Sequence, residues 1–283
     1  MKGWHGNMPP LLLATTQEVV SAMPEIFVKA DTLDAENARY AQTALRQPVF
    51  LNSVPKSGSH LLRNILRMFV PVTQQYSADF IQWGNLPQHR SAFDPAHPRL
   101  SWGHLFFADA SVVETAPARR LVLFRDPYDW VLARARFLLS EQFFGNVEHL
   151  RNGEIEIDEL LTMMIFGLPT KLPSLSAIYE LNAAAWLGAR CYPLKFEDLI
   201  GAVNTIDTSE AEIFFVRLLD ACGIDMPADW QDRVRVGSDR AQSATARENL
   251  TGVAVELPAA LGSRHRALVD YHAPGLRTVL GYT

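Results

Sequence analysis

The sequence predicts a single α/β domain in which helices flank a central parallel sheet. Three short apolar runs of strand composition, at residues 49–54, 120–124 and 190–195, are interleaved with runs of helical spacing. Strands that alternate with helices form parallel sheets covered on both faces. A chain of 283 residues, 48% of them hydrophobic, can bury one substantial core. No internal repeat or glycine-serine linker marks a second domain, so residues 1–283 are treated as one.

The expected elements follow from the N-terminus onward. Residues 1–47 are expected to form a helical flank, because residues 16–46 have a polar-faced helical pattern with a break near Pro24. The core, residues 48–200, is expected to contain, in order, a strand at 49–54, a helix at 60–70, an irregular stretch at 71–100, a strand at 120–124, a helix from about 128 to 139 and a strand near 190–195. Residues 201–283 are expected to be mainly helical, with 209–223 the clearest helix.

Composition excludes several classes of protein. The formal net charge of −5 argues against a general nucleic-acid binder, which would show a strong basic excess. The N-terminal run "PPLLLA" is too short for a membrane span and lacks a signal-peptide cleavage pattern. Cys191 and Cys222 match neither a disulfide framework nor a metal-ligand spacing. These features lead us to expect a reduced, cytoplasmic protein.

The stretch "VFLNSVPKSGSHLLRNIL" (49–66) joins a strand to a helix through a short polar loop. In a parallel sheet such a loop aims backbone N–H groups and the positive helix end at one point beyond the strands. The residues expected to form an anion cradle there are Lys56, Ser57, Gly58, Ser59 and His60. The alternative is a plain strand-to-helix turn with a serine N-cap. The common nucleotide loop, G-x-x-x-x-G-K-[ST], is absent because Lys56 precedes Gly58.

A second strand-to-helix junction carries an arginine. In "LVLFRDPYDWVLARARF", Arg125 follows the strand, Asp126 is placed to cap the next helix, and Pro127 suits its first turn. Arg125 could simply pair at the surface with Asp126 or Asp129. A lysine loop and an arginine at the same sheet edge are better explained by a ligand with two phosphate groups, which guanidinium recognises in a bidentate way.

Three motifs in order resemble the PAPS-dependent sulfotransferases. "PKSGSHLL" is similar to that family's 5′-phosphosulfate loop, "FRDPYDWVLARARF" to its 3′-phosphate segment, and "YPLKFEDLIG" to its strand-end Y-E-D-L element. The resemblance covers roughly residues 48–200. It implies a P-loop-NTPase-like sulfotransferase fold and PAPS (3′-phosphoadenosine 5′-phosphosulfate) as the donor.

The resemblance also implies roles for single residues. His104, in "RLSWGHLFF", occupies the place of the family's histidine base, although a lone histidine is more often structural. Lys56 would stabilise charge on the leaving phosphate, and no metal would be needed. The reaction would be in-line sulfuryl transfer to a hydroxyl or amine of a small-molecule or glycan acceptor.

The chain departs from the family pattern where the 3′-phosphate would bind. The family's serine eight residues after the arginine is Ala133 here, and the candidate substitutes are Arg134 and Arg136. The usual threonine pair is Ser59-His60, and the usual tryptophan is Leu61. The late R-K-G clamp is replaced by "SDRAQSATARENLTG". There, Arg240 and Arg247 are the alternatives, and Arg247 is the expected cofactor ligand.

Two other functions stay open at this stage. One is a P-loop-related kinase or nucleotide hydrolase, which would require Mg²⁺. The other is a sulfotransferase-like binding protein that has lost catalysis. The acceptor is expected to contact aromatic residues from 76–110 and 137–180, although core packing is the favoured explanation for most of them. The candidates are Tyr76, Trp83, Trp102, Phe106, Phe107, Phe143 and Phe144.

Overall fold

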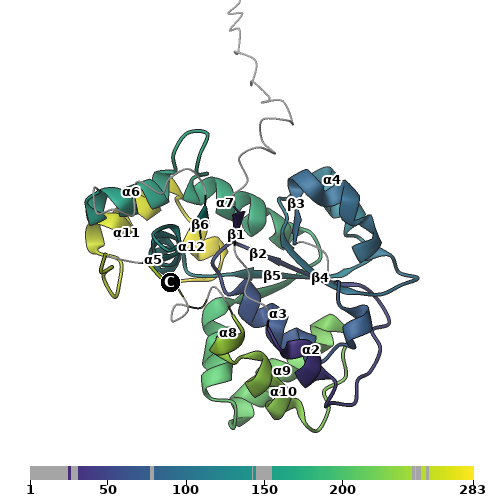
Figure 1. Cartoon of the computed structure of the whole chain (residues 1–283). Coiled ribbons are helices and arrows are strands. Elements are labelled where there is room, and N and C mark those ends of the chain that lie inside the picture. The colour runs from purple at the N-terminus through teal and green to yellow at the C-terminus, as the bar shows by residue number, and fades with distance from the viewer. Residues whose placement is uncertain are drawn as a thin grey trace, which may run out of the picture.

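Five parallel strands form the central sheet, in the order β3-β4-β2-β5-β7 (Figure 1). This computed structural model describes residues 25–26, 31–76, 80–141, 143–144, 155–243, 246, 250–252 and 255–283. The sheet strands are β2 (Val49–Ser53), β3 (Ile81–Gln82), β4 (Leu100–His104), β5 (Arg119–Phe124) and β7 (Tyr192–Lys195). A separate antiparallel pair joins β1 (Glu25–Ile26) to β6 (Phe143–Phe144).

Helices cover both faces of the sheet (Figure 1). The α-helices are α2 (Leu33–Asn37), α3 (Ser59–Arg67), α4 (Asp109–Glu114), α5 (Pro127–Leu138), α6 (Ile157–Phe166), α7 (Leu175–Asn182), α8 (Phe196–Asn204), α9 (Ser209–Cys222), α10 (Trp230–Gly237), α11 (Ser263–His272) and α12 (Leu276–Val279). Short 3₁₀ segments are η1 (Val72–Gln74), η2 (Trp83–Phe93), η4 (Ala184–Gly188) and η5 (Arg240–Gln242).

The two faces of the sheet bury different residues of the same strands. Val49 and Leu51 of β2 pack into a core that includes buried residues of α3, α8, α9 and α10. Phe50, between them, packs into the opposite core, with α5, α6 and α7. This alternation follows the two-residue period of a strand, and burial on both faces explains why β2 begins with three consecutive apolar residues. The expected α/β architecture is therefore confirmed.

The predicted strands and helices occur close to their expected positions, but two stretches differ. Residues 71–100, expected to be irregular, contain η1, β3 and η2, and β4 begins at Leu100. The two-residue β3 and a 3₁₀ segment interrupted by Pro87 are too short or too irregular to give a periodic signal.

The helical prediction for residues 16–46 was too broad. Within its described part only α2 is helical, and the residues from Arg39 to Arg46 form a turn, bends and irregular backbone. A five-residue helix is unstable alone and needs tertiary support. That support comes from buried Asn37, whose side-chain amide donates to the carbonyl oxygens of Arg67 (2.6 Å) and Val70 (3.0 Å).

Strand order brings the predicted motifs to one edge of the sheet. β2 is central and pairs with both β4 and β5, with Asn52 opposite Gly103 and Ser53 opposite Leu123. All three strands are parallel, so their carboxyl ends lie side by side. The lysine loop, Arg125 and His104 follow or end these strands and therefore share this edge.

Candidate active site

The loop between β2 and α3 has a backbone that only certain residues adopt. Lys56 and Gly58 both have positive φ angles, 67° and 91°, and Gly58 is the N-cap of α3. No side chain caps this helix. The alternative of a serine N-cap was therefore wrong. The first N–H groups of a helix have no partner within the helix, and an uncapped end is suited to bind an anion.

Gly58 is required by a close neighbour as well as by its φ angle. A Cβ atom at this position would lie 2.5 Å from the ring of Phe196, the first residue of α8. The same ring lies 4.6 Å from the guanidinium carbon of Arg125. Phe196 thus contacts both predicted phosphate elements, which the fold brings together as the spacing of motifs led us to expect.

Two buried polar atoms at this edge have no hydrogen-bond partner: the Oγ of Ser57, a fully buried residue, and the Nε of Arg125. Buried polar groups in folded proteins are almost always paired, so such atoms often mark a ligand site. They are hydrogen-bonding groups suited to phosphate oxygens, and the donor set fits a nucleotide with two separate phosphate groups.

Lys56 lies in an apolar setting. Its ammonium nitrogen is 2.9 Å from the centroid of the Phe137 ring, a cation–π contact from α5. The side chain is half-buried, and the cost of desolvating its charge lowers its pKa from 10.5 to about 7. An anionic ligand at the loop would favour the charged form and offset this cost.

His104, the last residue of β4, is held by the end of β2. Its Nδ1 lies 2.9 Å from the carbonyl oxygen of Ser53 and 3.1 Å from the Ser53 hydroxyl. That hydroxyl is also 2.7 Å from Ser59 Oγ and 3.3 Å from the carbonyl oxygen of Gly103. Ser53 therefore links the histidine to the first residue of the loop helix.

The environment of His104 keeps its imidazole neutral. Burial is the main cause that lowers its pKa to about 4, and the charge of Lys56 acts in the same direction. Phe80, just before β3, packs edge-on against the imidazole, with ring centroids 5.2 Å apart. The pairing of β3 with β4 needs a glycine at position 103, because a Cβ atom there would lie 2.0 Å from the carbonyl oxygen of Ile81.

His60 contacts an aromatic group and has a neutral side chain. Its ring packs edge-on against Trp102, with centroids 5.1 Å apart. Burial, with a contribution from the charge of Lys56, lowers its pKa to about 3. Ser59, the other residue at the family's threonine pair, lies in the hydrogen-bond network of Ser53.

The alternative in which Arg125 pairs with Asp126 was wrong. Asp126 accepts a hydrogen bond from the backbone N–H of Tyr128 (3.0 Å), which caps α5 as predicted. Its carboxylate also pairs with Arg277 of α12 at 3.0 Å. The nearby Arg125 guanidinium has no ion pair to either Asp126 or Asp129 within the described ranges, and contacts Phe196 instead.

Arginines were considered as substitutes for the family's 3′-phosphate serine, which is Ala133 here, and for its late R-K-G clamp, and they lie in different places. Arg134 points into the core, where it donates to the carbonyl oxygens of Met164 (3.0 Å) and Pro173 (2.8 Å), so its role is structural. Arg240 opens η5. Arg247, the expected clamp residue, lies outside the residues that the structure describes.

The candidate acceptor residues divide into two groups. Trp102 contacts Phe80 (centroids 5.6 Å apart) and so belongs to the surroundings of His104. Phe143 packs on Phe137, the ring that contacts Lys56. Phe107 packs on Trp186, and Tyr76 packs on His89. Trp83 is 48% exposed. No ring contact with Phe106 is found among the described residues. The side chain of Phe144 lies outside the described part. Sequence reasoning missed Ser53, Phe80, Phe137 and Phe196.

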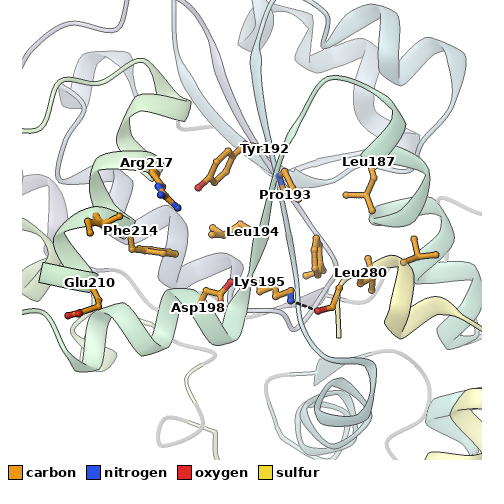
Figure 2. Close-up of a pocket in the computed structure, with 14 residues that line it drawn as sticks. Leu187, Tyr192, Pro193, Leu194, Lys195, Asp198, Glu210, Phe214, Arg217 and Leu280 are labelled. Atoms are coloured by element: carbon orange, nitrogen blue, oxygen red, sulfur yellow. Dashed lines mark hydrogen bonds between the residues drawn. The ribbon is translucent and has the colours of Figure 1, made fainter. Parts of the chain in front are cut away.

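A cavity of about 460 Å³ lies beside β7 (Figure 2). Its lining includes Tyr192 and Lys195 of β7 and Arg217 of α9. β7 is one edge strand of the sheet, whereas β4, which carries His104, lies on the other side of β2 and β5. The cavity is therefore not the space next to the imidazole.

Two further features bear on the class of protein. None of the helices in the described ranges has the length and apolar character needed to cross a membrane. Among those same residues, no three His, Cys, Asp or Glu side chains gather in a way that could hold a metal ion.

Comparison with solved structures identifies the fold. Neither the protein-family models nor the curated protein sequences give a match. Among solved structures, mouse sulfotransferase SULT7A1 complexed with PAP aligns over 88% of this chain and 90% of its own, with a TM-score of 0.54 and 14% identity. A sulfotransferase domain from the curacin biosynthetic pathway aligns over 85% and 99%, with a TM-score of 0.40 and 12% identity. The chain has the sulfotransferase fold, a single α/β domain around a five-stranded parallel sheet.

Proposed function

We propose that this protein is a PAPS-dependent sulfotransferase that transfers a sulfuryl group to a hydroxyl or amine of a small-molecule or glycan acceptor. The observation that carries the proposal is the meeting of the Lys56 loop and Arg125 at the ring of Phe196, with unpaired polar atoms on Ser57 and Arg125. Two separate cationic groups at adjacent strand ends fit a nucleotide that is phosphorylated at two positions.

The residues proposed to hold the donor divide by position. Lys56, Ser57, Gly58, Ser59 and His60 would surround its 5′-phosphosulfate, while Arg125 and Arg247 would contact its 3′-phosphate. The bound donor supplies an activated sulfuryl group. Lys56 and the free N–H groups of α3 would stabilise the negative charge that develops on the leaving phosphate. A SULT7A1 structure contains PAP, the product form of such a donor, which supports this reading of a site on the same fold.

His104 is proposed as the base that accepts the proton of the attacking hydroxyl. Nδ1 must carry the hydrogen in the neutral ring, because the carbonyl oxygen of Ser53 can only accept. Nε2 then holds the lone pair that a general base needs. A neutral imidazole at pH 7 follows from its lowered pKa. The proposal places the protein in the cytoplasm, with Cys191 and Cys222 as the free thiols that they are in the structure.

Thermal-shift measurements with three ligands test the proposal. A ligand that binds only the folded state raises the melting temperature. Adenosine 3′,5′-bisphosphate without metal should raise it clearly, and ATP with Mg²⁺ should raise it less. A shift with MgATP and none with millimolar bisphosphate would favour the kinase or hydrolase alternative. Bisphosphate binding without transfer to any of a broad acceptor panel would favour the non-catalytic alternative.

A further inference from the structure

One cation near His104 is not used by the proposed mechanism. Arg63 lies on α3, one turn beyond His60, and its guanidinium carbon is 4.5 Å from the centroid of the Trp102 ring. The side chain is half-buried, and no hydrogen bond or ion pair joins it to another residue of the described chain. Within the residues that the structure describes, its charge therefore lacks an ion-pair partner, which is unusual for an arginine so close to the core.

The carboxylates near enough to affect Arg63 are already engaged. Asp31 and Asp34 favour its charged form electrostatically. Both, however, accept hydrogen bonds from Arg67: Asp31 at 2.7 and 3.1 Å, and Asp34 at 2.7 Å. With both acids committed to Arg67, no carboxylate among the described residues forms an ion pair with Arg63. Burial is the main cause that lowers its pKa to about 10, so it is still a cation at neutral pH.

A continuous run of aromatic contacts leads from Arg63 to the proposed base. Trp102 contacts Phe80, and Phe80 contacts His104. Trp102 and His104 are two residues apart on β4, so their side chains share one face of the sheet and start about 6.6 Å apart. All three aromatic residues and Arg63 are half-buried, so each keeps some surface for a ligand.

We propose that Arg63 and Trp102 form an anion subsite for the acceptor, which would be an aromatic alcohol with a carboxylate or similar anionic group one ring away from the reacting hydroxyl. This inference rests on the proposed function for the role of the hydroxyl. The acceptor ring packs beside Phe80 and Trp102, with its hydroxyl toward His104. Its anionic group pairs with the guanidinium, whose fork of N–H donors matches a carboxylate. The contact with Trp102 holds the guanidinium in place for this pairing.

A matched pair of phenols tests the subsite. The probes are 3-(4-hydroxyphenyl)propionate and its uncharged amide, which share the ring and the reacting hydroxyl. The variant is Arg63→Gln. The control is Arg99→Gln, which removes another half-buried arginine that lies over a ring, 5.8 Å from the Tyr76 centroid. The value of kcat/KM for each phenol is measured with saturating PAPS. Binding of each phenol to protein saturated with adenosine 3′,5′-bisphosphate is measured by calorimetry.

The wild-type protein should bind and sulfate the carboxylate at least about tenfold better than the amide, the usual size of a charge-assisted contact. Arg63→Gln should remove this preference, with the amide and bisphosphate affinities unchanged to within about twofold. Arg99→Gln should keep it. The inference is overturned if the preference is absent, if it survives Arg63→Gln, if that variant weakens both phenols equally, or if neither phenol binds.

Failure of the anion subsite and failure of the proposed function give different results in this experiment. Carboxylate binding that depends on Arg63, without any transfer, leaves the subsite in place and removes the proposed sulfotransferase activity. Transfer to the amide at a rate equal to the carboxylate leaves the activity in place and removes the subsite.

Discussion

Nδ1 of His104 lies 2.9 Å from the carbonyl oxygen of Ser53. A carbonyl oxygen cannot donate, so this contact fixes the hydrogen of the neutral imidazole on Nδ1 and the lone pair on Nε2. The residue that sets the tautomer is the last residue of the central strand, the strand that also leads into the lysine loop. The orientation of the proposed base is thus tied to the central, buried strand of the sheet.

Replacing His104 with alanine should abolish most transfer and leave bisphosphate affinity nearly unchanged. We expect a loss of about 10²–10⁴-fold in kcat, the usual contribution of a general base. His104→Gln should not restore activity, because an amide cannot accept the proton at neutral pH. Transfer to a screened acceptor and bisphosphate binding are measured in parallel. His60→Ala is the matched control. An active His104→Ala beside an inactive His60→Ala would assign the base to the other histidine.

Lys56 and Arg125 should affect different steps. Lys56→Ala should lower the single-turnover rate at saturating PAPS by roughly two to three orders of magnitude, since it removes a preorganised charge from the leaving phosphate. Arg125→Ala should mainly raise the Kd of the bisphosphate, by about 10–100-fold for one charged contact. Rapid-quench transfer and equilibrium binding separate the two effects. Equal effects of both variants on the saturated rate would rule out this division.

Bisphosphate affinity should fall as the pH rises above 7. The pKa of Lys56 in the free protein is about 7, so its charged form is lost above that pH. A bound phosphate would raise this pKa and keep the lysine protonated. Linkage then weakens binding by up to about tenfold per pH unit. The ligand's own phosphates gain charge above pH 6, which would act in the opposite direction. The Kd is measured by calorimetry from pH 6 to 9.

Lys56→Arg is the control for this pH dependence, because an arginine stays charged throughout that range. Its affinity should be nearly constant between pH 7 and 9, even if it is weaker overall. Titration of His104 should not change the transfer rate near pH 6.5. The pKa of its imidazole is about 4, so the proposed base is already neutral above about pH 5.5. A wild-type affinity that does not change with pH would show that Lys56 stays charged.

Gly58→Ala should destabilise the protein by about 1–3 kcal/mol, because alanine disfavours a φ of 91°. Contact with Phe196 should add to this cost and displace the loop, so that bisphosphate binding weakens too. The control is Gly201→Ala in α8, where the added methyl group meets no atom within 4 Å and should stabilise by about 0.5–1 kcal/mol. Urea unfolding measures both. A Gly58→Ala protein as stable as the wild type would disprove the constraint.

Sequence reasoning located the parts of the site that lie within one motif. The lysine loop and Arg125 follow recognisable strands, and parallel order places them at one edge. His104 was found through the family resemblance, because its strand, β4, was not predicted. The contacts between these parts could not be predicted from the sequence. Phe137 is the last residue but one of α5, and Phe196 is the first residue of α8. In the sequence both resemble ordinary core residues, whereas in the structure Phe137 contacts Lys56 and Phe196 lies beside Gly58.

Arg134 is a residue for which the prediction from the local motif differs from the structure. Its place near the missing serine made it a plausible phosphate ligand, but α5 turns it toward the carbonyl oxygens of Met164 and Pro173. The direction of a helical side chain depends on rotation about the helix axis, which tertiary packing sets and a local motif does not. β3 was missed for a related reason, because two residues cannot display a period.

The hydroxyl of Ser53 carries one hydrogen but lies within reach of two acceptors, Ser59 Oγ and the carbonyl oxygen of Gly103. It can serve only one of them at a time. When Ser59 turns its own hydrogen toward an anion in the loop, its oxygen is left to accept from Ser53. The same Ser53 oxygen lies 3.1 Å from Nδ1 of His104. Ser53 Oγ therefore connects the loop to the base, so that a change in the hydrogen bonds of Ser59 reaches Nδ1 of His104 through one shared oxygen atom.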